Sequence, residues 1–424
     1  MGKHLGVAAS GSAEVTQTAV DILEAGGNAF DAALGALCTA SIAEPLLASL
    51  GGGGFMLALA GGNKPSVYDF FCQTPGRRRP QNETEFYPIM ANFGAAEQEF
   101  YIGLGSSAVP GVVAGIFEAH RDLGRMPMAE IMAPAIELAR SGVEVDAFHH
   151  YVIRILQPIM TATPESFALY ESPGQPGKLI SDGEMLRNPA AADALEALAE
   201  NGPELFYRGE WARRLVEDCR EKGGHMTLED LQGYRVERRK PVVFPYRGVR
   251  IAINPPPSPG GCLVAFALGV MSDWDSEGAQ WGNPDHMMNL LRGMRAASLA
   301  RHAFSMEGGM DLETMGRLLD KETIREWQRS MQLHSLFTRG TTHISVADSD
   351  GNIASLTASN GEGCSYVLPG TGIMLNNMLG EEDLHPGGFN RWIEGARLSS
   401  ICLLYTSPSP RDPLRYRVCR LLLE

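Results

Sequence analysis

One short polar stretch constrains this chain more than any other. Residues 341–352 read Thr-Thr-His-Ile-Ser-Val-Ala-Asp-Ser-Asp-Gly-Asn, and apolar side chains return at Ile353 and Leu356. The dipeptide Asp350-Gly351 readily adopts the positive backbone angles that a hairpin turn needs. The stretch therefore predicts a β-hairpin whose first strand begins at Thr341 or Thr342.

The start of this hairpin also suits covalent catalysis. A Thr hydroxyl is a weak nucleophile unless a base takes its proton, and the amine of the same residue can do so once the preceding peptide bond is cut. Gly340 favours such a cut because it has no side chain to shield its carbonyl and it tolerates strained backbone. Paired threonines are also ordinary strand material, so from this segment alone both interpretations of Thr341 remain open.

Composition and charge narrow the classes of partner. The chain has 424 residues, of which 44% are hydrophobic and 20% charged, and this indicates a globular protein with a large core. Its net charge of -14 argues against binding a nucleic-acid backbone or an anionic membrane and favours small molecules or peptides. No apolar run reaches the roughly 18 residues of a membrane span. No apolar core of signal-peptide length follows Met1, which by itself favours the cytoplasm but does not determine the compartment.

Neither a metal nor a cofactor is expected. The seven cysteines are scattered and form no CxxC pair, and the histidines lack helical ligand spacing with acids. The glycine run at residues 51–54 is followed by Phe55 and Met56 rather than by the Lys-Ser or Lys-Thr of a phosphate loop. We expect the run to allow close backbone approach at a crowded point.

Hydrophobic periodicity predicts a layered α+β fold. Helical patterns cover residues 12–25 and 30–44, ahead of the glycine run, and residues 189–223, 284–301 and 312–333 further on, the last with a break near Asp320. Strand-like alternation covers residues 242–253, with an interruption at Tyr246-Arg247-Gly248. A helix-rich first half and a strand-rich end favour layers of helix and sheet.

Several segments together resemble the gamma-glutamyltranspeptidases, a family of N-terminal-nucleophile hydrolases. They are residues 25–33, 50–56, 109–115, 255–261, 341–343, 370–373, 375–377 and 398–400, in family order. The resemblance implies a four-layer αββα sandwich, made as one precursor that cuts itself between Gly340 and Thr341. Residues 1–340 would then form the large-subunit region and residues 341–400 the start of the small-subunit region, the two subunits remaining partners.

The same resemblance implies roles for two hydroxyls. Thr341 would attack the amide carbonyl of a gamma-glutamyl or related acylamide substrate, with its own amine as general base, and would pass the acyl group to water or to an amine. Ser359 stands where the family has a hydroxyl that hydrogen-bonds the nucleophile. An ordinary strand serine is the alternative reading of that position.

The pocket for a glutamyl head group departs from the family pattern. Phe71 stands where the family usually has an Arg that grips the substrate's α-carboxylate, a bidentate task that no neutral side chain can copy. The basic triplet at residues 77–79 is the only nearby replacement that the sequence suggests. Two polar family positions fall on Gly361, with Asn360 one step away, and on Met378.

Other substrate-binding positions are retained. The acidic partner of the substrate amine corresponds to Glu381, or to Glu382 if the loop shifts, and Ser399 and Ser400 match the paired serines that help to hold the carboxylate. We therefore expect the hydrolase chemistry more firmly than the glutamyl specificity. The alternatives are a cephalosporin-acylase-like or glutaryl-acylase-like amidohydrolase and an inactive, uncleaved binding homologue, and the retained residues 341–343 argue against the latter.

The last residues depart from the family altogether. Family members continue after the paired serines with a glycine pair that supplies the oxyanion hole, whereas residues 401–424 contain no glycine. Residues 402–412 match the translation of a sequencing-library adapter. We expect the genuine sequence to stop at Ser400, so that the chain as written is C-terminally truncated and would neither mature nor turn over. Different codons in the nucleotide record would contradict this.

Overall fold

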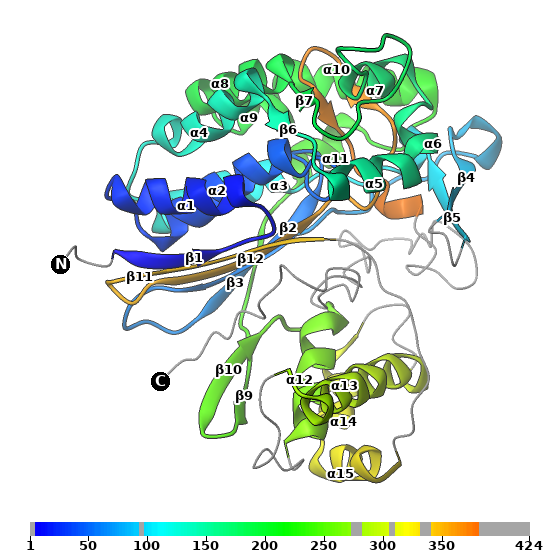
Figure 1. The fold of residues 1–424 in the computed structure, drawn as a ribbon. Helices are drawn as coiled ribbons and strands as arrows, with labels where there is room; N and C mark the ends of the chain where they lie inside the picture. The colour runs from blue at the N-terminus through cyan, green and yellow to red at the C-terminus, as the bar shows by residue number, and fades with distance from the viewer. Residues whose placement is uncertain (1–4, 93–96, 273–281, 305–309, 331–340, 381–424) are drawn as a thin grey trace. The chain divides into compact units, whose positions relative to one another are not determined.

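A computed structural model describes residues 5–92, 97–272, 282–304, 310–330 and 341–380 (Figure 1). The chain divides into two compact units, which are treated separately here. The larger comprises Met1–Lys64, Tyr68–Arg238 and Thr341–Ser399, and the smaller comprises Pro65–Val67, Arg239–Gly340 and Ser400–Glu424. Residues from both sides of the predicted cleavage point therefore build the larger unit.

A six-stranded sheet with the order β1-β11-β12-β2-β3-β8 forms the centre of the larger unit. The strands are β1 (Gly6–Ala9), β2 (Gly53–Leu59), β3 (Ser66–Phe70), β8 (Glu237–Arg239), β11 (Thr342–Asp348) and β12 (Ile353–Ser359). The predicted hairpin is confirmed as β11 and β12, and Gly351 has the positive φ of 80° that the turn requires. The hairpin lies between β1 and β2, which come from the start of the chain.

Helices α1 (Ala13–Glu24) and α2 (Ala29–Ala43) cover one face of this sheet, as Figure 1 shows. Both helices occur where the periodicity predicts them, and their caps explain where they begin. Ser12 accepts a hydrogen bond from the Val15 amide, and Asn28 forms a reciprocal capping box with Asp31. Nearly every residue of α2 is buried, so it is the central helix of the core.

Alternate side chains of the hairpin pack into that same core. Ile344 and Val346 of β11 and Ala354 and Leu356 of β12 are almost inaccessible to solvent and belong to one cluster with α2. Because strand side chains alternate between faces, Thr341 and Ser359 share the opposite face with His343. The hydrophobic pattern therefore fixes which way the predicted catalytic residues point.

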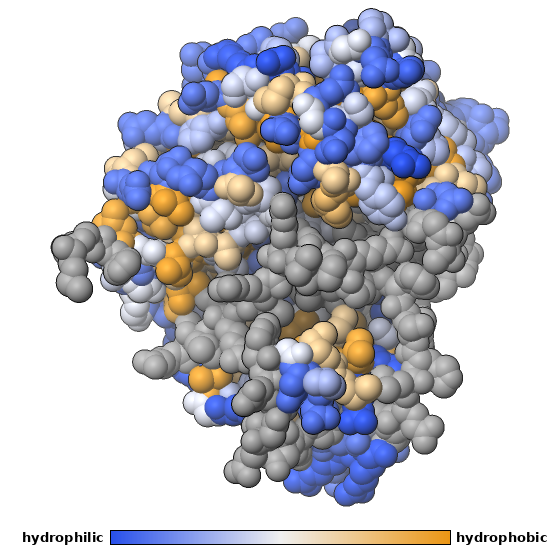
Figure 2. Space-filling model, viewed as in Figure 1, coloured by the Kyte–Doolittle hydropathy of each residue, from blue (hydrophilic) through white to orange (hydrophobic). Residues whose placement is uncertain are grey.

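The remaining elements of the larger unit surround this centre. The helices are α3 (Val112–Leu123), α4 (Met128–Ser141), α5 (Ala147–Ile155), α6 (Gln157–Met160), α7 (Pro164–Leu169), α8 (Pro189–Asn201), α9 (Glu204–Tyr207), α10 (Glu210–Lys222) and α11 (Leu228–Gly233). Three further two-stranded pairs are β4 (Tyr87–Asn92) with β5 (Glu97–Ile102), β6 (Val143–Glu144) with β7 (Met185–Leu186), and β13 (Val367–Leu368) with β14 (Ile373–Met374). Hydrophilic residues predominate on the helices at the top of the view in Figure 2.

The smaller unit has its own core. It contains the hairpin of β9 (Val242–Tyr246) and β10 (Val249–Ile253) and the helices α12 (Pro259–Met271), α13 (Pro284–Ala303), α14 (Leu312–Leu318) and α15 (Lys321–Ser330). The interruption predicted at residues 246–248 is the turn of that hairpin. The break predicted near Asp320 is also confirmed, since the Asp320 carboxylate accepts the Glu322 amide, at 2.8 Å, where the next helix begins.

The predicted α+β class is confirmed. In the described residues, helices cover a six-stranded sheet, as a layered fold requires. None of the helices in these residues is both long enough and apolar enough to cross a membrane.

Candidate active site

Thr341 lies at the head of a central strand. It immediately precedes β11, and the register pairs Thr342 with Ala358 of β12. One further step along the two strands sets Ser359 opposite Thr341 on the same face, where facing Cβ atoms are typically about 4.5–5.5 Å apart. The register thus places the two predicted catalytic residues at facing positions on neighbouring strands.

Two buried oxygens at this end of the hairpin lack hydrogen-bond partners among the described residues. They are Thr341 Oγ1 and Asn360 Oδ1. The side-chain nitrogen of Asn360, Nδ2, in contrast, donates to the Leu375 carbonyl at 3.5 Å. A buried polar atom without a partner costs about 1–3 kcal/mol, so two of them on neighbouring segments indicate a place that a ligand completes.

The glycine run allows the start of β2 and the end of β3 to lie close to these residues. Gly53 pairs with Ser359, and a Cβ atom on Gly52 would collide with the Ser359 carbonyl oxygen. A Cβ atom on Gly53 would collide with the backbone nitrogen of Cys72. The predicted close backbone approach is confirmed, and it brings the segment after β3 against the start of β2, which pairs with the end of β12.

Phe71 is part of that segment and is held firmly in place. Its side chain is 5% exposed and stacks on Phe55 with the ring centroids 5.4 Å apart. Its amide donates to Asp69 at 3.1 Å, and its carbonyl accepts the Tyr234 hydroxyl at 2.8 Å. At the position where the family has its Arg, this chain therefore has a buried aromatic side chain, which has no hydrogen-bond donor for an α-carboxylate.

The basic triplet at residues 77–79 does not act together as a replacement for the family's Arg. Arg79 donates to the carbonyls of Cys219 and Arg220 at 3.1 and 3.0 Å, so its guanidinium holds the end of α10. Arg77 and Arg78 have exposed side chains.

His343 lies on the same strand face as Thr341. Its Nδ1 lies 2.7 Å from the Thr357 hydroxyl and its Nε2 lies 3.0 Å from the Ser345 hydroxyl. Burial lowers the pKa of His343 to about 4. The ring is therefore neutral at pH 7, and it connects β11 to β12 without placing a charge beside Thr341.

Glu44 is a contact of the nucleophile strand that sequence reasoning missed. Its side chain is 3% exposed at the C-terminal end of α2, and it accepts a hydrogen bond from the Thr342 hydroxyl. Carboxylates are disfavoured at helix C-termini because of the helix dipole. A carboxylate at the end of an otherwise apolar helix, just before Pro45, was the sequence signal by which Glu44 could have been singled out.

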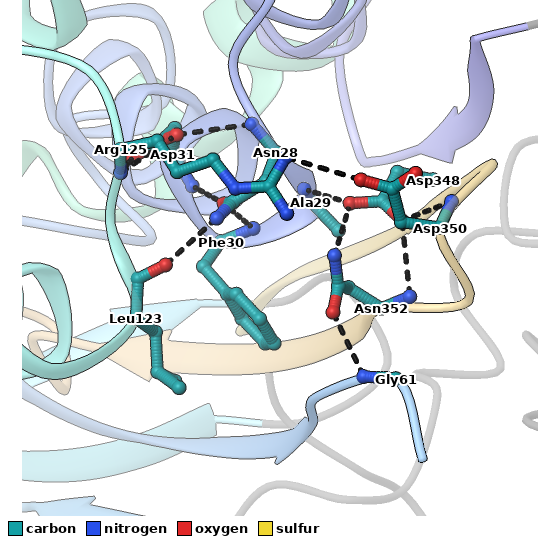
Figure 3. Close-up of polar contacts among 10 residues, drawn as sticks. All are labelled: Asn28, Ala29, Phe30, Asp31, Gly61, Leu123, Arg125, Asp348, Asp350 and Asn352. Atoms are coloured by element: carbon teal, nitrogen blue, oxygen red, sulfur yellow. Dashed lines mark hydrogen bonds and ion pairs between the residues drawn. The ribbon is translucent and has the colours of Figure 1, made fainter. Parts of the chain in front are cut away.

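The other end of β11 is anchored by a second carboxylate (Figure 3). One oxygen of Asp348 accepts the Ala29 amide at 2.9 Å and the Asn352 side-chain amide at 2.7 Å. The other oxygen accepts the backbone amides of Asp350 and Asn352 at 2.9 and 3.0 Å. Asn352 in turn accepts the Gly61 amide at 2.8 Å, which links the turn to the end of β2.

The segment after β14 connects to the glycine run. Asn376 donates to the carbonyls of Gly51 and Ala108 at 2.8 and 3.0 Å and accepts the Ala108 amide at 3.0 Å. Met378 is 1% exposed and begins a short 3-10 helix, so it is part of the packing. Gly361 follows Asn360 with a positive φ of 63°.

Several predicted residues lie outside the described ones. They are Gly340, Glu381, Glu382, Ser399, Ser400 and the tail at residues 401–424. Of the predicted site, the structure therefore brings together Thr341, Ser359 and Asn360.

Comparisons with known proteins agree with this arrangement. The chain is 30% identical over 383 residues to the Acylase ACY 1 proenzyme of Pseudomonas sp. (strain V22), which covers 86% of this chain and 67% of that protein. It is 29% identical over 399 residues to the glutathione hydrolase proenzyme of Escherichia coli (strain K12), which covers 90% of this chain and 67% of that protein.

Solved structures agree as well. The crystal structure of cephalosporin acylase from Bacillus halodurans matches with a TM-score of 0.74 and 26% identity, over 93% of this chain and 73% of that one. Helicobacter pylori gamma-Glutamyltranspeptidase shares the fold, with a TM-score of 0.66 and 24% identity, over 79% of this chain and 94% of that one. The sequence model described as Gamma-glutamyltranspeptidase matches residues 15–401. Matched over most of its length, the chain belongs to the gamma-glutamyltranspeptidase family.

Proposed function

We propose that this family member is a Thr-nucleophile amidohydrolase and acyltransferase that uses Thr341 on gamma-glutamyl amides. The observation that carries the proposal is the buried, unpartnered hydroxyl of Thr341, at the head of a central strand and opposite Ser359. A precursor cut between Gly340 and Thr341 would give this residue the free amine that its activation requires. Both relatives named above are called proenzymes, in keeping with such a cut.

The two products of the cut have reason to stay together. Strands β1 and β2 come from residues before the cut, while β11 and β12 come from residues after it. Because β11 pairs with β1 and β12 pairs with β2, one sheet joins the two chains. We therefore expect the large and small subunits to form one complex.

The chemistry follows from the local geometry. The Thr341 amine takes the hydroxyl proton while Oγ1 attacks the amide carbonyl, and the leaving amine departs with a proton as the C–N bond breaks. Water or an acceptor amine then attacks the resulting ester and releases Thr341. Ser359 Oγ accepts the Gly361 amide at 3.1 Å, so its own proton remains available to be donated toward Thr341.

Asn360 is our candidate for the first contact with the substrate head group. Its buried, unpartnered Oδ1 suits a substrate N–H donor such as an α-amine. Glu381, Ser399 and Ser400 remain the predicted residues for the rest of an α-amino acid head group.

A second candidate function is favoured by Phe71. A buried aromatic ring stands where the family's carboxylate-gripping Arg is expected, which suits an acyl group without an α-carboxylate. This would be an acylase-like amidohydrolase with the same nucleophile and the same cut.

One pair of measurements tests both candidates in the full-length gene product. Intact mass should show two chains, the smaller of which begins at Thr341, whereas a single uncut chain would point to the binding homologue. A chromogenic gamma-glutamyl anilide should then be hydrolysed faster than the glutaryl anilide that lacks the α-amine. Preference for the glutaryl compound would replace the first candidate by the second.

A further inference from the structure

The hydrogen bond between Thr342 and Glu44 is a costly feature for a core. The Thr342 side chain is fully buried, Glu44 is 3% exposed, and the bond joins residues 298 positions apart. Removing a carboxylate from water costs several kcal/mol unless partners compensate. The contact is therefore a polar connection between the end of α2 and the head of β11 inside an otherwise apolar core.

Backbone pairing leaves the nucleophile end of β11 weakly held. Strand β1 pairs with residues 345–348 only. Residues 342–344 have β12 as their one strand neighbour within the part of the chain that the structure describes. Chain ends fray unless they are tied down, and the proposed cut turns this half of β11 into a chain end.

Glu44 is in a position to hold the Thr341 end of β11. Its amide donates to the Ala40 carbonyl at 2.8 Å, and its own carbonyl accepts the amides of Leu47 and Ala48 at 2.8 and 3.0 Å. The carboxylate therefore extends from a fixed backbone at the end of α2. The first turn of the same helix binds Asp348 through Ala29, so α2 holds β11 at both of its ends.

We propose that Glu44 is a positioning residue that holds the new N-terminus of β11 through the Thr342 hydroxyl. It keeps the amine and hydroxyl of Thr341 aligned beside Ser359 after the cut. Before the cut, the chain preceding Thr341 provides a covalent tether, so the bond matters most in the mature form. The inference rests on the proposed function and concerns a residue that need not touch the substrate.

The test compares two variants at one position in the full-length gene product. Thr342→Val removes the hydroxyl and keeps the shape, whereas Thr342→Ser keeps the hydroxyl. We expect Thr342→Val to lower kcat of the mature enzyme by about tenfold, the size of effect typical for a buried hydrogen bond to a charged group, with KM little changed. Thr342→Ser should restore most of kcat.

Hydrogen exchange distinguishes the proposed role from a purely structural contact, because a structural contact would protect the amides of β11 equally before and after the cut. The amides of residues 342–345 should lose protection in cut Thr342→Val protein. They should stay protected in the uncut Thr341→Ala/Thr342→Val protein, where the chain is continuous. Asp348→Asn is the matched control at the other end of the strand, and it should lower stability while leaving kcat unchanged.

The outcomes separate the two levels of the proposal. Equal loss of protection in cut and uncut proteins, or an unchanged kcat in Thr342→Val, would overturn the role of Glu44 and leave the proposed function standing. If Thr342→Val alone does not fold, the Glu44→Gln/Thr342→Val variant, which also replaces the buried carboxyl group by an amide, provides the same comparison. A wild-type chain that is never cut would overturn the proposed function and this inference with it.

Discussion

The two ends of strand β11 are built for different purposes. At the Asp348 end the strand has a neighbour on each side, and both carboxylate oxygens accept two hydrogen bonds. At the Thr341 end, among the described residues, it has one strand neighbour, and the buried hydroxyl of Thr341 lacks a partner. The satisfied end contributes stability, and the unsatisfied end is available for chemistry.

The difference teaches where substitutions should separate activity from stability. Changes at the Thr341 end should affect turnover, and changes at the Asp348 end should affect unfolding. The following predictions, all for the full-length gene product, test that separation or mark its limits.

The largest effect is expected for Thr341→Ala. It removes the proposed nucleophile, so we expect the precursor to stay uncut and hydrolysis to fall by at least about 10³-fold. The thermal midpoint should stay close to that of wild type, because the lost hydroxyl has no partner among the described residues. Intact mass, an anilide assay and calorimetry measure the three quantities. Residual self-cleavage in this variant would place the nucleophile elsewhere.

Asp348→Ala should show the reverse pattern. It leaves two backbone amides of the turn, the amide at the start of α2 and the Asn352 side chain without their acceptor. We expect the free energy of unfolding to fall by about 2–3 kcal/mol, with kcat per folded molecule unchanged. Urea titration and active-site counting check this. A large fall in kcat at unchanged stability would mean that the two ends are not separable.

His343 predicts a pH dependence near the catalytic half of the strand. Burial lowers its pKa from 6.5 to about 4, so between these values the unfolded chain binds the proton more readily than the folded chain. The contribution of this ring to stability is therefore intact above pH 6.5 and is lost as the pH falls toward 4. His343→Gln should show a smaller loss of unfolding free energy than wild type between pH 7 and 4.5. Parallel curves for the two proteins would contradict a buried, neutral ring.

The smallest effect is expected for Arg125→Gln. Its guanidinium lies 3.1 Å from Asp350, but the two side chains are 56% and 58% exposed. Exposed ion pairs typically contribute about 0–1 kcal/mol, so we expect a change near the lower limit and no effect on kcat. A large loss of stability would show that the turn depends on this pair as well as on Asp348.

Local patterns predicted the elements that carry the site. The turn at Asp350-Gly351 and the helices α1 and α2 depend on residues that are close in sequence. Steric demand also predicted the role of the glycine run. These features need no knowledge of distant partners, which is why the sequence was sufficient.

Local patterns could not predict the long-range contacts that organise the site. Glu44 meets Thr342 across 298 positions, and Asp348 meets Ala29 across 319. No periodicity within a segment specifies pairs so far apart. The hairpin of β4 and β5 was also missed, because Pro88 lies within a strand, where it is tolerated only when its missing N–H is not needed by a neighbour.

The position of the hairpin in the sheet has a consequence for synthesis. Strands β1 and β2 are made early, but they are separated in the sheet by β11 and β12, which emerge only after residue 341. Until then both early strands have edges without these partners, a state prone to wrong pairing and aggregation. The hairpin is thus the closing piece of the sheet, and the Ser359 that faces Thr341 comes into place only with it. Self-cleavage at Thr341 would therefore report that assembly of the sheet is complete.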